Sequence, residues 1–589
     1  MKEVGTIYGI SGSIVKVKIT DNVSMGETVT IGNLNLIGEV IRLNTEFVVV
    51  QVFEETSGLK IGESVYGSGN LLSVSLGAGI IGNIFDGIGR PLKDIQEKTG
   101  TFISRGVQVE NLDIDKKWPT KIVVYNGDNL KSGNIVAEVK ETSIITHKVM
   151  IPIDISGVVI WSAADGEYTI NDTLIKLKAK NGDIIEIKMI QKWAIRSPRP
   201  VKNKYAIDKP LITGQRIIDT LFPIGKGGTA ALPGGFGTGK TMTQHQLAKW
   251  SDADIIVYIG CGERGNEMTQ VLEEFSNLTD PKTNNPLMDR TVLIANTSNM
   301  PVAAREASIY TGITIAEYYR DMGYHVAIMA DSTSRWAEAL RELSGRLEEM
   351  PAEEGFPAYL ASRLASFYER AGFVESLSGK EGSVTIIGAV SPQGGDFSEP
   401  VTQNTKRFVR SFWTLDRSLA YARHFPAIHW LTSYSEYLGD LEDWYIENVG
   451  KDFIKQRENI MRILNEENEL MEIVKLIGSD VLPDSQKIIL EIARVIRLGF
   501  IQQNAYHKFD TYVPLKKQMK MMEIILYLYE KTKLLIDMSI PINVLKEHSI
   551  FDDVISIKYD VGNNQLEELE KYFKRIDIFY NKIHAANKI

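Results

Sequence analysis

The chain has 589 residues, a mass of 65.9 kDa and a formal net charge of −9 at pH 7. Hydrophobic residues make up 43% of it and charged residues 24%, proportions that fit a soluble globular protein and exclude a disordered, collagen-like or simple coiled-coil chain. At roughly 150 residues per domain, this length predicts three or four domains. The single cysteine, Cys261, excludes a disulfide within the chain and a multi-cysteine zinc site.

The sequence shows neither a targeting segment nor a basic surplus. Its N-terminus reads MKEVG and continues into strand-like sequence without the apolar segment of a signal peptide. No run reaches roughly 18 consecutive apolar residues, so we expect no transmembrane helix. The acidic balance weakly disfavours nucleic-acid binding, because proteins of that class usually carry excess lysine and arginine.

Residues 1–75 alternate with a period of two, so that Val15 and Val17 share one face while Lys16 takes the other. Glycines separate the short apolar runs of this region. The pattern is typical of a small β-barrel, which we predict for residues 1–75. Residues 76–110 are expected to be a connecting segment.

Residues 111–196 are predicted to form a second, inserted β-rich module. Turn signals recur there, for example at Asn126-Gly127 and Asn181-Gly182, and strand-like runs such as residues 158–161 lie between them. No pattern within this module points to chemistry.

The pattern changes in residues 197–435, where short apolar runs alternate with helical stretches. Residues 255–260 and 326–330 are predicted strands, and residues 240–250 and 305–322 are predicted helices. This alternation indicates a parallel sheet that is covered on both faces.

Residues 436–589 are mostly helical in pattern, which predicts a C-terminal helical domain. One helix is expected to begin after Pro483, with Asp484 or Ser485 as its N-cap, and another to span residues 515–536.

A phosphate loop is the most specific motif in the chain. Residues 234–241 read GGFGTGKT and satisfy the pattern G-x-x-x-x-G-K-[ST] completely. Glycines let backbone N–H groups close around phosphate oxygens, in conformations that a side chain would forbid. The lysine can reach the β- and γ-phosphates, and the threonine hydroxyl can bind Mg²⁺. The predicted nucleotide-binding residues are Gly234, Gly235, Phe236, Gly237, Thr238, Gly239, Lys240 and Thr241.

Hydrolysis further requires a group that orients water and a group that holds the metal ion. Asp331 ends a strand-like run and fits the metal-holding acid, with helix capping as the alternative role. Glu263 follows the strand after the phosphate-loop helix, where it can position water; the alternative is a solvated loop acid. Arg264 can contact a phosphate or pair with Glu263.

Five motifs together resemble the catalytic A subunit of V-type and A-type rotary ATPases. They are GGFGTGKT at 234–241, CGERGNEMT at 261–269, NTSNMPVAAREASIYTGIT at 296–314, IMADSTSRWAEALRE at 328–342 and EEGFPAYLASRLASFYERAG at 353–372. The resemblance covers essentially the whole chain, and the inserted module separates it from the F-type β subunit. It implies a multidomain α/β fold with an N-terminal β-barrel, the inserted module, a RecA-like nucleotide-binding domain and a C-terminal helical domain.

The resemblance also implies a role for each site residue. Lys240 and Thr241 would bind the phosphates and the Mg²⁺ of ATP or ADP. Glu263 would activate the attacking water, Arg264 would contact a phosphate, and Asp331 would hold Mg²⁺ through water.

The adenine pocket and the phosphate loop each hold a departure from patterns seen in similar subunits. Phe425 resembles one aromatic wall of the adenine pocket, and Tyr506 falls where a second wall is expected, although phenylalanine is the usual residue there. Tyrosine keeps the stacking face but adds a hydroxyl that needs water or a partner. Many eukaryotic vacuolar A subunits place cysteine where Thr238 stands, so the resemblance implies an enzyme of bacterial or archaeal style.

The resemblance implies the catalytic subunit of a motor on the cytoplasmic face of a membrane, which couples ATP hydrolysis or synthesis to H⁺ or Na⁺ transport. Expected partners are a central shaft, a peripheral stalk, a membrane ion-translocating sector and a noncatalytic B-type subunit. The B-type subunit would supply an arginine finger, because the corresponding stretch here, residues 387–396, contains no arginine.

Two other interpretations of the nucleotide core remain open at this point. A ring-shaped nucleic-acid translocase would need a basic or aromatic barrel, and residues 1–75 have no dense cluster of lysine and arginine. A noncatalytic regulatory nucleotide binder would not need the complete set of Lys240, Thr241, Glu263 and Asp331.

Overall fold

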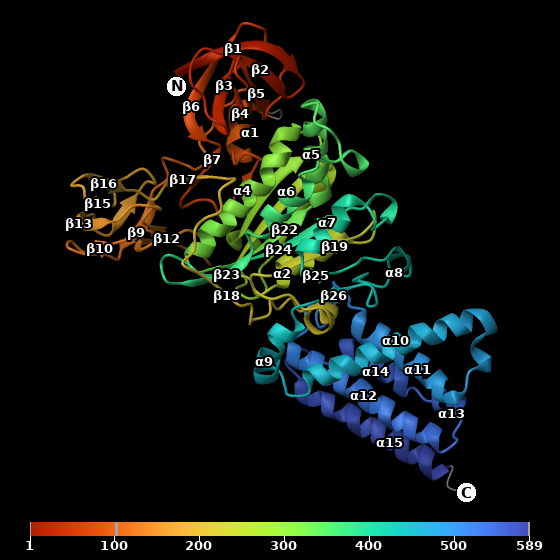
Figure 1. Cartoon of the computed structure of the whole chain (residues 1–589). Coiled ribbons are helices and arrows are strands. Elements are labelled where there is room, and N and C mark those ends of the chain that lie inside the picture. Colours follow the sequence, from red (N-terminus) through yellow and green to blue (C-terminus); the bar gives the residue numbers. More distant parts are fainter. Residues whose placement is uncertain (1, 101–103, 587–589) are drawn as a thin grey trace. The chain divides into compact units, whose positions relative to one another are not determined.

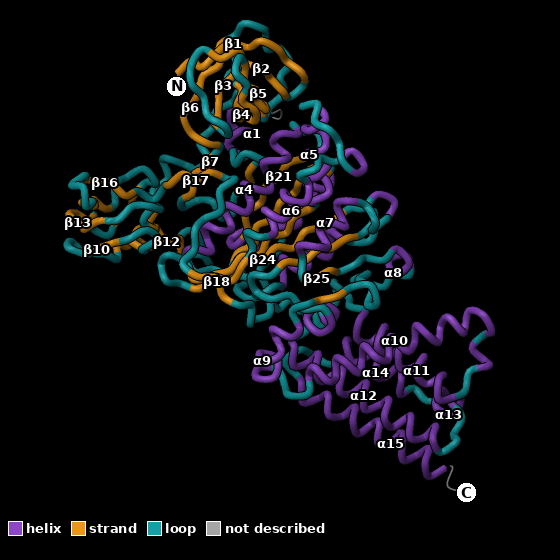
Figure 2. Tube along the Cα trace, in the orientation of Figure 1, coloured by secondary structure: helices purple, strands orange, loops and turns teal. Residues whose placement is uncertain are grey.

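The computed structural model describes residues 2–100 and 104–586. The chain divides into two compact units. The first comprises the chain up to Ala206, Lys226–Ala231 and Ala253–Val409, and the second comprises Ile207–Gly225, Leu232–Asp252 and the chain from Arg410 onward. Strands dominate the N-terminal part of the first unit, and long helices dominate the C-terminal part of the second (Figure 2).

The first six strands form a closed barrel in the order β1-β2-β5-β4-β3-β6 (Figure 1). Val15 and Val17 are buried in its core while Lys16 between them is exposed, as the alternating pattern predicts. The predicted N-terminal barrel is therefore confirmed. Its strands are β1 (Lys2–Ser11), β2 (Ile14–Ile19), β3 (Glu27–Ile31), β4 (Leu36–Leu43), β5 (Phe47–Val52) and β6 (Ser64–Leu71).

Two four-stranded sheets make up the inserted region, in the orders β10-β13-β15-β16 and β12-β11-β9-β14. After these sheets, β17 (Gln191–Ala194) pairs antiparallel with β7 (Ser73–Leu76). The strands of the two sheets are β9 (Trp118–Ile122), β10 (Asn129–Leu130), β11 (Ile135–Lys140), β12 (Thr146–Met150), β13 (Gly157–Ser162), β14 (Gly166–Tyr168), β15 (Ile175–Lys178) and β16 (Ile184–Ile187).

A parallel sheet forms the centre of the first unit. Strands β24, β22, β20, β21 and β8 are neighbours in that order, and each adjacent pair is parallel. Their side chains are buried almost throughout, as expected for a parallel sheet between two layers. The strands are β8 (Ile84–Phe85), β20 (Ile255–Glu263), β21 (Thr291–Thr297), β22 (His325–Asp331) and β24 (Glu381–Val390).

Helix α4 (Val302–Asp321) packs against this sheet and against helix α5 (Thr333–Arg346). It begins before the predicted Arg305, directly after Pro301, because the extended conformation of that proline stops the helix from continuing further back. The remaining elements of the unit are α1 (Leu92–Thr99), α3 (Gly265–Asn277), α6 (Leu360–Tyr368), α7 (Pro400–Phe408), β18 (Asn203–Tyr205) and β23 (Gly372–Glu375).

The second unit holds the phosphate-loop helix and the C-terminal helices, which confirms the predicted helical domain. Its elements are α2 (Lys240–Trp250), β25 (Ser411–Phe412), α8 (Arg417–Tyr421), β26 (Tyr434–Ser435), α9 (Leu438–Asn448), α10 (Phe453–Ile477), α11 (Asp484–Val495), α12 (Leu515–Asp537), α13 (Ile542–Lys546), α14 (Ile550–Asp560) and α15 (Glu570–Ala586). Strand β19 (Thr229–Pro233) leads from the first unit into the second.

The predicted cap of α11 is wrong. The helix begins at Asp484 itself, with Pro483 at the N-cap position and no side-chain cap. The Asp484 carboxylate instead accepts a hydrogen bond from the backbone N–H of Ile542, at 3.2 Å. A partner distant in the sequence therefore replaces the local cap.

No helix in the described part of the chain combines the length and the apolar character that crossing a bilayer requires.

A buried polar cluster joins the inserted module to α4 within the first unit. The Tyr319 hydroxyl of α4 lies 2.9 and 3.0 Å from the two oxygens of Glu141, and the N–H groups of Gly79 and Ile81 donate to one of these oxygens, at 2.8 and 3.0 Å. His147 Nδ1 lies 3.3 Å from the other oxygen. A buried carboxylate is costly unless it is hydrogen-bonded, so these donors allow Glu141 to tie three segments together.

We expect Glu141→Ala to lower the free energy of unfolding by about 3–5 kcal/mol, because it leaves several buried donors without an acceptor. Thermal unfolding followed by calorimetry provides the measurement, with Glu138→Ala on β11 as a matched control outside the cluster. Equal melting temperatures for the two variants would contradict the structural role of Glu141.

Candidate active site

The phosphate loop lies in the second unit, between β19 and α2. Gly237 and Gly239 have φ angles of +77° and +87°, in the left-handed region that favours glycine. Gly239 is also the N-cap of α2, and the helix begins at Lys240, as the sequence predicts. The loop therefore has the strand–loop–helix setting in which backbone N–H groups and a helix N-terminus can face a phosphate.

Side chains of the loop are held by its own backbone. Lys240 Nζ donates to the carbonyls of Gly234 and Gly235, at 2.7 and 3.2 Å, which places the ammonium group across the loop. The buried Thr238 hydroxyl donates to the Gly235 carbonyl at 2.8 Å. Thr241 lies partly buried in the first turn of α2, and Phe236 is exposed at the tip of the loop. A fixed cation thus accompanies the anion-binding backbone.

Both predicted aromatic residues belong to this unit as well. A Cβ atom placed on Gly239 would lie 3.5 Å from Phe425 Cε1, so the phenylalanine ring lies against the end of the phosphate loop. Phe425 is 42% exposed and Tyr506 is 87% exposed, so both offer ring surface to a ligand. The backbone N–H of Gln503 donates to the Phe425 carbonyl at 2.8 Å, which links the two loops that carry these rings.

Arg417 is a candidate that sequence reasoning missed. A Cβ atom on Gly235 would lie 2.8 Å from Arg417 Nε, so the guanidinium lies directly on the phosphate loop. The residue opens α8, whose N-cap Asp416 accepts a hydrogen bond from Leu419. Arg417 belongs to no recognisable sequence motif, so only the folded structure shows that it lies beside the phosphate loop.

The two predicted acids lie in the first unit, at the ends of neighbouring parallel strands. Glu263 is the last residue of β20 and Asp331 is the last residue of β22. The register pairs Gly260 with Asp331, so both carboxylates lie at the carboxyl edge of the sheet. This is the edge at which parallel α/β sheets bind ligands.

Burial and like charge shape the electrostatics of this acidic pair. Burial, followed by the negative charges of Asp331 and Glu267, raises the pKa of Glu263 to about 8, while Arg335 opposes the shift. Asp331 is 2% exposed and accepts a hydrogen bond from the Tyr258 hydroxyl at 3.1 Å. Burial, together with Asp331, raises the pKa of Tyr258 well above its usual value, so the phenol stays protonated as a donor.

Three arginines lie around the end of β20. Arg264, at the N-cap of α3, is largely exposed and pairs with Glu267 at 3.9 Å. Gly262 has a φ of +72°, and a Cβ atom there would lie 2.9 Å from both Arg305 Cδ and Arg335 Cβ. Glycine at this position thus allows two arginines to approach the strand end beside Glu263.

Four models of the ATP synthase alpha/beta and V/A-type families match the chain in order. They describe the β-barrel domain at residues 7–69, the barrel-sandwich domain at 109–196, the nucleotide-binding domain at 214–435 and the C-terminal domain of V and A type ATP synthase at 442–543.

Curated relatives share more than half of their residues with this chain over nearly its whole length. It is 60% identical to the V-type ATP synthase alpha chain 2 of Clostridium tetani, over 98% of both chains. It is 59% identical to the V-type ATP synthase alpha chain of Halothermothrix orenii, over 99% of both. It is 55% identical to the A subunit of the A-type ATP synthase of Methanopyrus kandleri, over 97% of both.

A solved structure of the ATPase EscN from the type III secretion system of enteropathogenic E. coli shares the fold. The TM-score is 0.63 with 22% identity, covering 89% of this chain and all of EscN, and this level of identity supports the fold alone. The sequence matches are far stronger and extend through the C-terminal domain model of V and A type ATP synthases. The chain therefore belongs to the family of V-type ATP synthase alpha chains and A-type ATP synthase A subunits.

Proposed function

We propose that this chain binds Mg-ATP through its phosphate loop and acts on it with Glu263 and Asp331. As an alpha/A subunit it is the catalytic subunit of a rotary ATPase, in which ATP hydrolysis or synthesis is coupled to ion transport across a membrane. The observation that carries the residue assignment is the pair of acids at adjacent strand ends, Asp331 buried and Glu263 partly buried, in a chain that also has a complete phosphate loop. The transported ion is H⁺ or Na⁺, and the motor lies on the cytoplasmic face of its membrane.

Binding of the nucleotide falls to the second unit. Backbone N–H groups of Gly234–Thr241 and the Lys240 ammonium neutralise the phosphates. Phe425 and Tyr506 stack on the adenine, which suits their exposed ring faces. Arg417 adds a further cation beside the loop.

A bound Mg²⁺ would supply charge neutralisation to the phosphates. Thr241 and Asp331 fit this ion, because hydroxyl and carboxylate oxygens are the ligands that Mg²⁺ prefers. The Tyr258 hydroxyl fixes the orientation of the Asp331 carboxylate, as second-layer donors commonly do for metal ligands.

Glu263 is assigned to activate the attacking water by accepting its proton. With a pKa of about 8, Glu263 holds a proton at neutral pH in its buried surroundings. A cation near the acidic pair, such as the Mg²⁺ that accompanies the nucleotide, would favour the ionised form of Glu263 and so its action as a base. Arg264, exposed beside it, is assigned to a phosphate contact.

A different subunit is proposed to complete the site. Residues 387–396 contain no arginine, and they form the end of β24 and a short 3₁₀ turn. Arg335 pairs with Glu338, Arg346 pairs with Glu342, and Arg305 donates to the Ser298 carbonyl, so each has a partner in its own chain. We assign the arginine finger to a B-type subunit that alternates with this one in a ring, together with a central shaft, a peripheral stalk and a membrane sector.

We expect Glu263→Gln to retain ATP binding but to reduce turnover by at least about 100-fold, the scale of a positioned acid–base group. Steady-state hydrolysis by the assembled complex and nucleotide binding are measured on the same preparation. Glu273→Gln, on the exposed face of α3, is the control and should keep normal turnover. Parallel loss of binding and turnover would show that Glu263 has a structural role instead.

The raised pKa of Glu263 also predicts how stability depends on pH. Between pH 4.5 and about 8 the unfolded chain releases this proton while the folded chain keeps it, so ionisation increasingly favours unfolding as the pH rises. Glutamine does not titrate, so Glu263→Gln should raise the melting temperature at pH 8.5 and leave it unchanged at pH 4.5. Thermal unfolding in nucleotide-free buffer tests this, and a difference that does not vary with pH would refute it.

The purified chain alone is expected to be a poor ATPase, because an arginine finger contributes about 10³–10⁵-fold to phosphoryl-transfer rates. The rate of ATP hydrolysis is measured for this chain with and without its B-type partner, at the same concentration of this chain. Full activity of the chain alone would overturn the assignment of the finger to another subunit.

A further inference from the structure

We propose that Arg216 is a positioning residue that locks together the two loops carrying the adenine-binding rings. These are the Phe425 loop (residues 422–428) and the Tyr506 loop (residues 502–510). The inference rests on the proposed adenine contacts and adds the residue that holds them in place. Every residue that carries it belongs to the second unit.

Arg216 is fully buried and precedes the short π-helix Ile217–Leu221. Its Nη1 pairs with Asp510 Oδ1 at 2.5 Å, its Nε donates to the Phe500 carbonyl at 2.5 Å, and its Nη2 donates to the Gln502 carbonyl at 2.7 Å. One planar guanidinium therefore contacts the start of the Tyr506 loop, its end and the residues before it. Only arginine presents donors in this fixed fork.

The backbone of the same residue contacts the loop as well. The Arg216 N–H donates to the side-chain oxygen of Gln503 at 2.9 Å, and the Gln503 amide donates to the carbonyls of Gly214 and Asp510, at 2.8 and 2.7 Å. The second oxygen of Asp510 accepts a hydrogen bond from the Asn504 N–H at 2.7 Å. The Tyr506 loop is thus closed on itself across the Arg216–Asp510 pair.

The closed loop is in turn tied to the Phe425 loop. The Gln503 N–H donates to the Phe425 carbonyl at 2.8 Å, and the Gln502 side chain donates to the Arg423 carbonyl at 3.3 Å. Asn504 accepts a hydrogen bond from the Tyr506 N–H at 2.9 Å, which fixes the backbone that carries the second ring. Displacing Gln503 would therefore move both rings.

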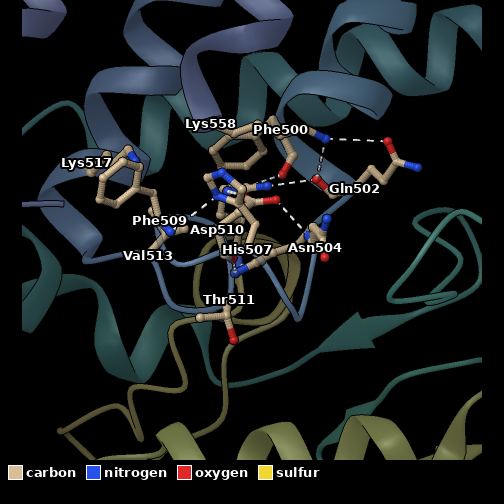
Figure 3. Close-up of polar contacts among 12 residues, drawn as sticks. Phe500, Gln502, Asn504, His507, Phe509, Asp510, Thr511, Val513, Lys517 and Lys558 are labelled. Carbon is tan, nitrogen blue, oxygen red and sulfur yellow. Dashed lines mark hydrogen bonds and ion pairs between the residues drawn. The ribbon is translucent and has the colours of Figure 1, made fainter. Parts of the chain in front are cut away.

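A second buried cation shares this cluster. Lys558 of α14 donates to the carbonyls of Leu498 and Gln502, at 2.6 and 3.2 Å, and Figure 3 shows its contacts with Gln502. Burial lowers the pKa of Lys558 to about 8, with Asp510 opposing this effect and Arg216 adding to it. Asp510 thus balances two buried cations, so its charge as well as its shape is required.

When the two rings are already held in the binding arrangement, less conformational entropy of the protein is lost as the ligand binds. These four hydrogen bonds of Arg216 end on the Tyr506 loop and on Phe500 just before it, and not on Gly234–Thr241. Loosening the cluster should therefore weaken binding of nucleotides but not of a phosphate-only ligand. If the rings then adopt the binding arrangement about a tenth of the time, the Kd for ADP rises about tenfold.

The test compares ADP with inorganic pyrophosphate on the assembled complex. In Arg216→Lys, which keeps the charge and loses the fork, we expect the Kd for ADP to rise about tenfold while the Kd for pyrophosphate stays within about twofold. The KM for ATP should rise by a larger factor than kcat falls. Asp510→Asn, which is nearly isosteric, should also raise the Kd for ADP and leave that for pyrophosphate nearly unchanged. If the Arg216 variant does not fold, the Asp510 variant alone tests the positioning role.

Arg457→Gln is the matched control, because Arg457 also donates to a backbone carbonyl, that of Leu221, which lies outside both loops. It should leave both affinities unchanged. Equal weakening of ADP and pyrophosphate in the Arg216 and Asp510 variants, or no weakening of ADP, would overturn the positioning role.

Two further variants separate this inference from the function on which it rests. Phe425→Ala should weaken ADP alone, and Lys240→Ala should weaken both ligands. If Phe425→Ala has no effect on ADP, the adenine assignment itself fails. If Phe425→Ala weakens ADP while Arg216→Lys and Asp510→Asn do not, only the positioning role fails.

Discussion

The parallel alignment of β20 and β22 is the constraint on which the acidic part of the site depends. Strands buried on both faces exclude charge along their length, so an acid can be accommodated only where each strand ends. Parallel neighbours end at the same edge, which brings Glu263 and Asp331 to one side of the sheet. Their mutual repulsion, added to burial, holds Glu263 in its protonated form and leaves the pair responsive to a cation.

Buried charges elsewhere in the molecule are surrounded by groups that compensate them. Glu141 is surrounded by donors from three segments, and Arg216 meets both a carboxylate and backbone carbonyls. These groups are compensated, and their effect is to join segments that are far apart in the sequence. The like-charged pair Glu263 and Asp331 differs from them, and strongly shifted pKa values of this kind cluster at functional sites.

Much of the architecture followed from local patterns. The period of two in the barrel, the glycines of the phosphate loop and the start of α2 at Lys240 each depend on residues close together in the chain. Asp484 shows the limit of this reasoning, because its carboxylate found a partner in Ile542 instead of capping its own helix. Arg417 and Arg216 escaped prediction for a related reason, since neither belongs to a motif and both act on segments distant in sequence.

The sequence by itself determined the classes of element, the phosphate loop and, through its motifs, the family, and it pointed to the two acids as candidates. These depend on short-range chemistry: backbone freedom at glycine, hydrophobic periodicity and the order of residue types along the chain. Only the tertiary structure decided that Glu263 lies beside Asp331 with a raised pKa, and that Arg216 ties the Phe425 and Tyr506 loops together. Burial and the pairing of charges depend on which distant segments meet, and that is settled by packing of the folded chain.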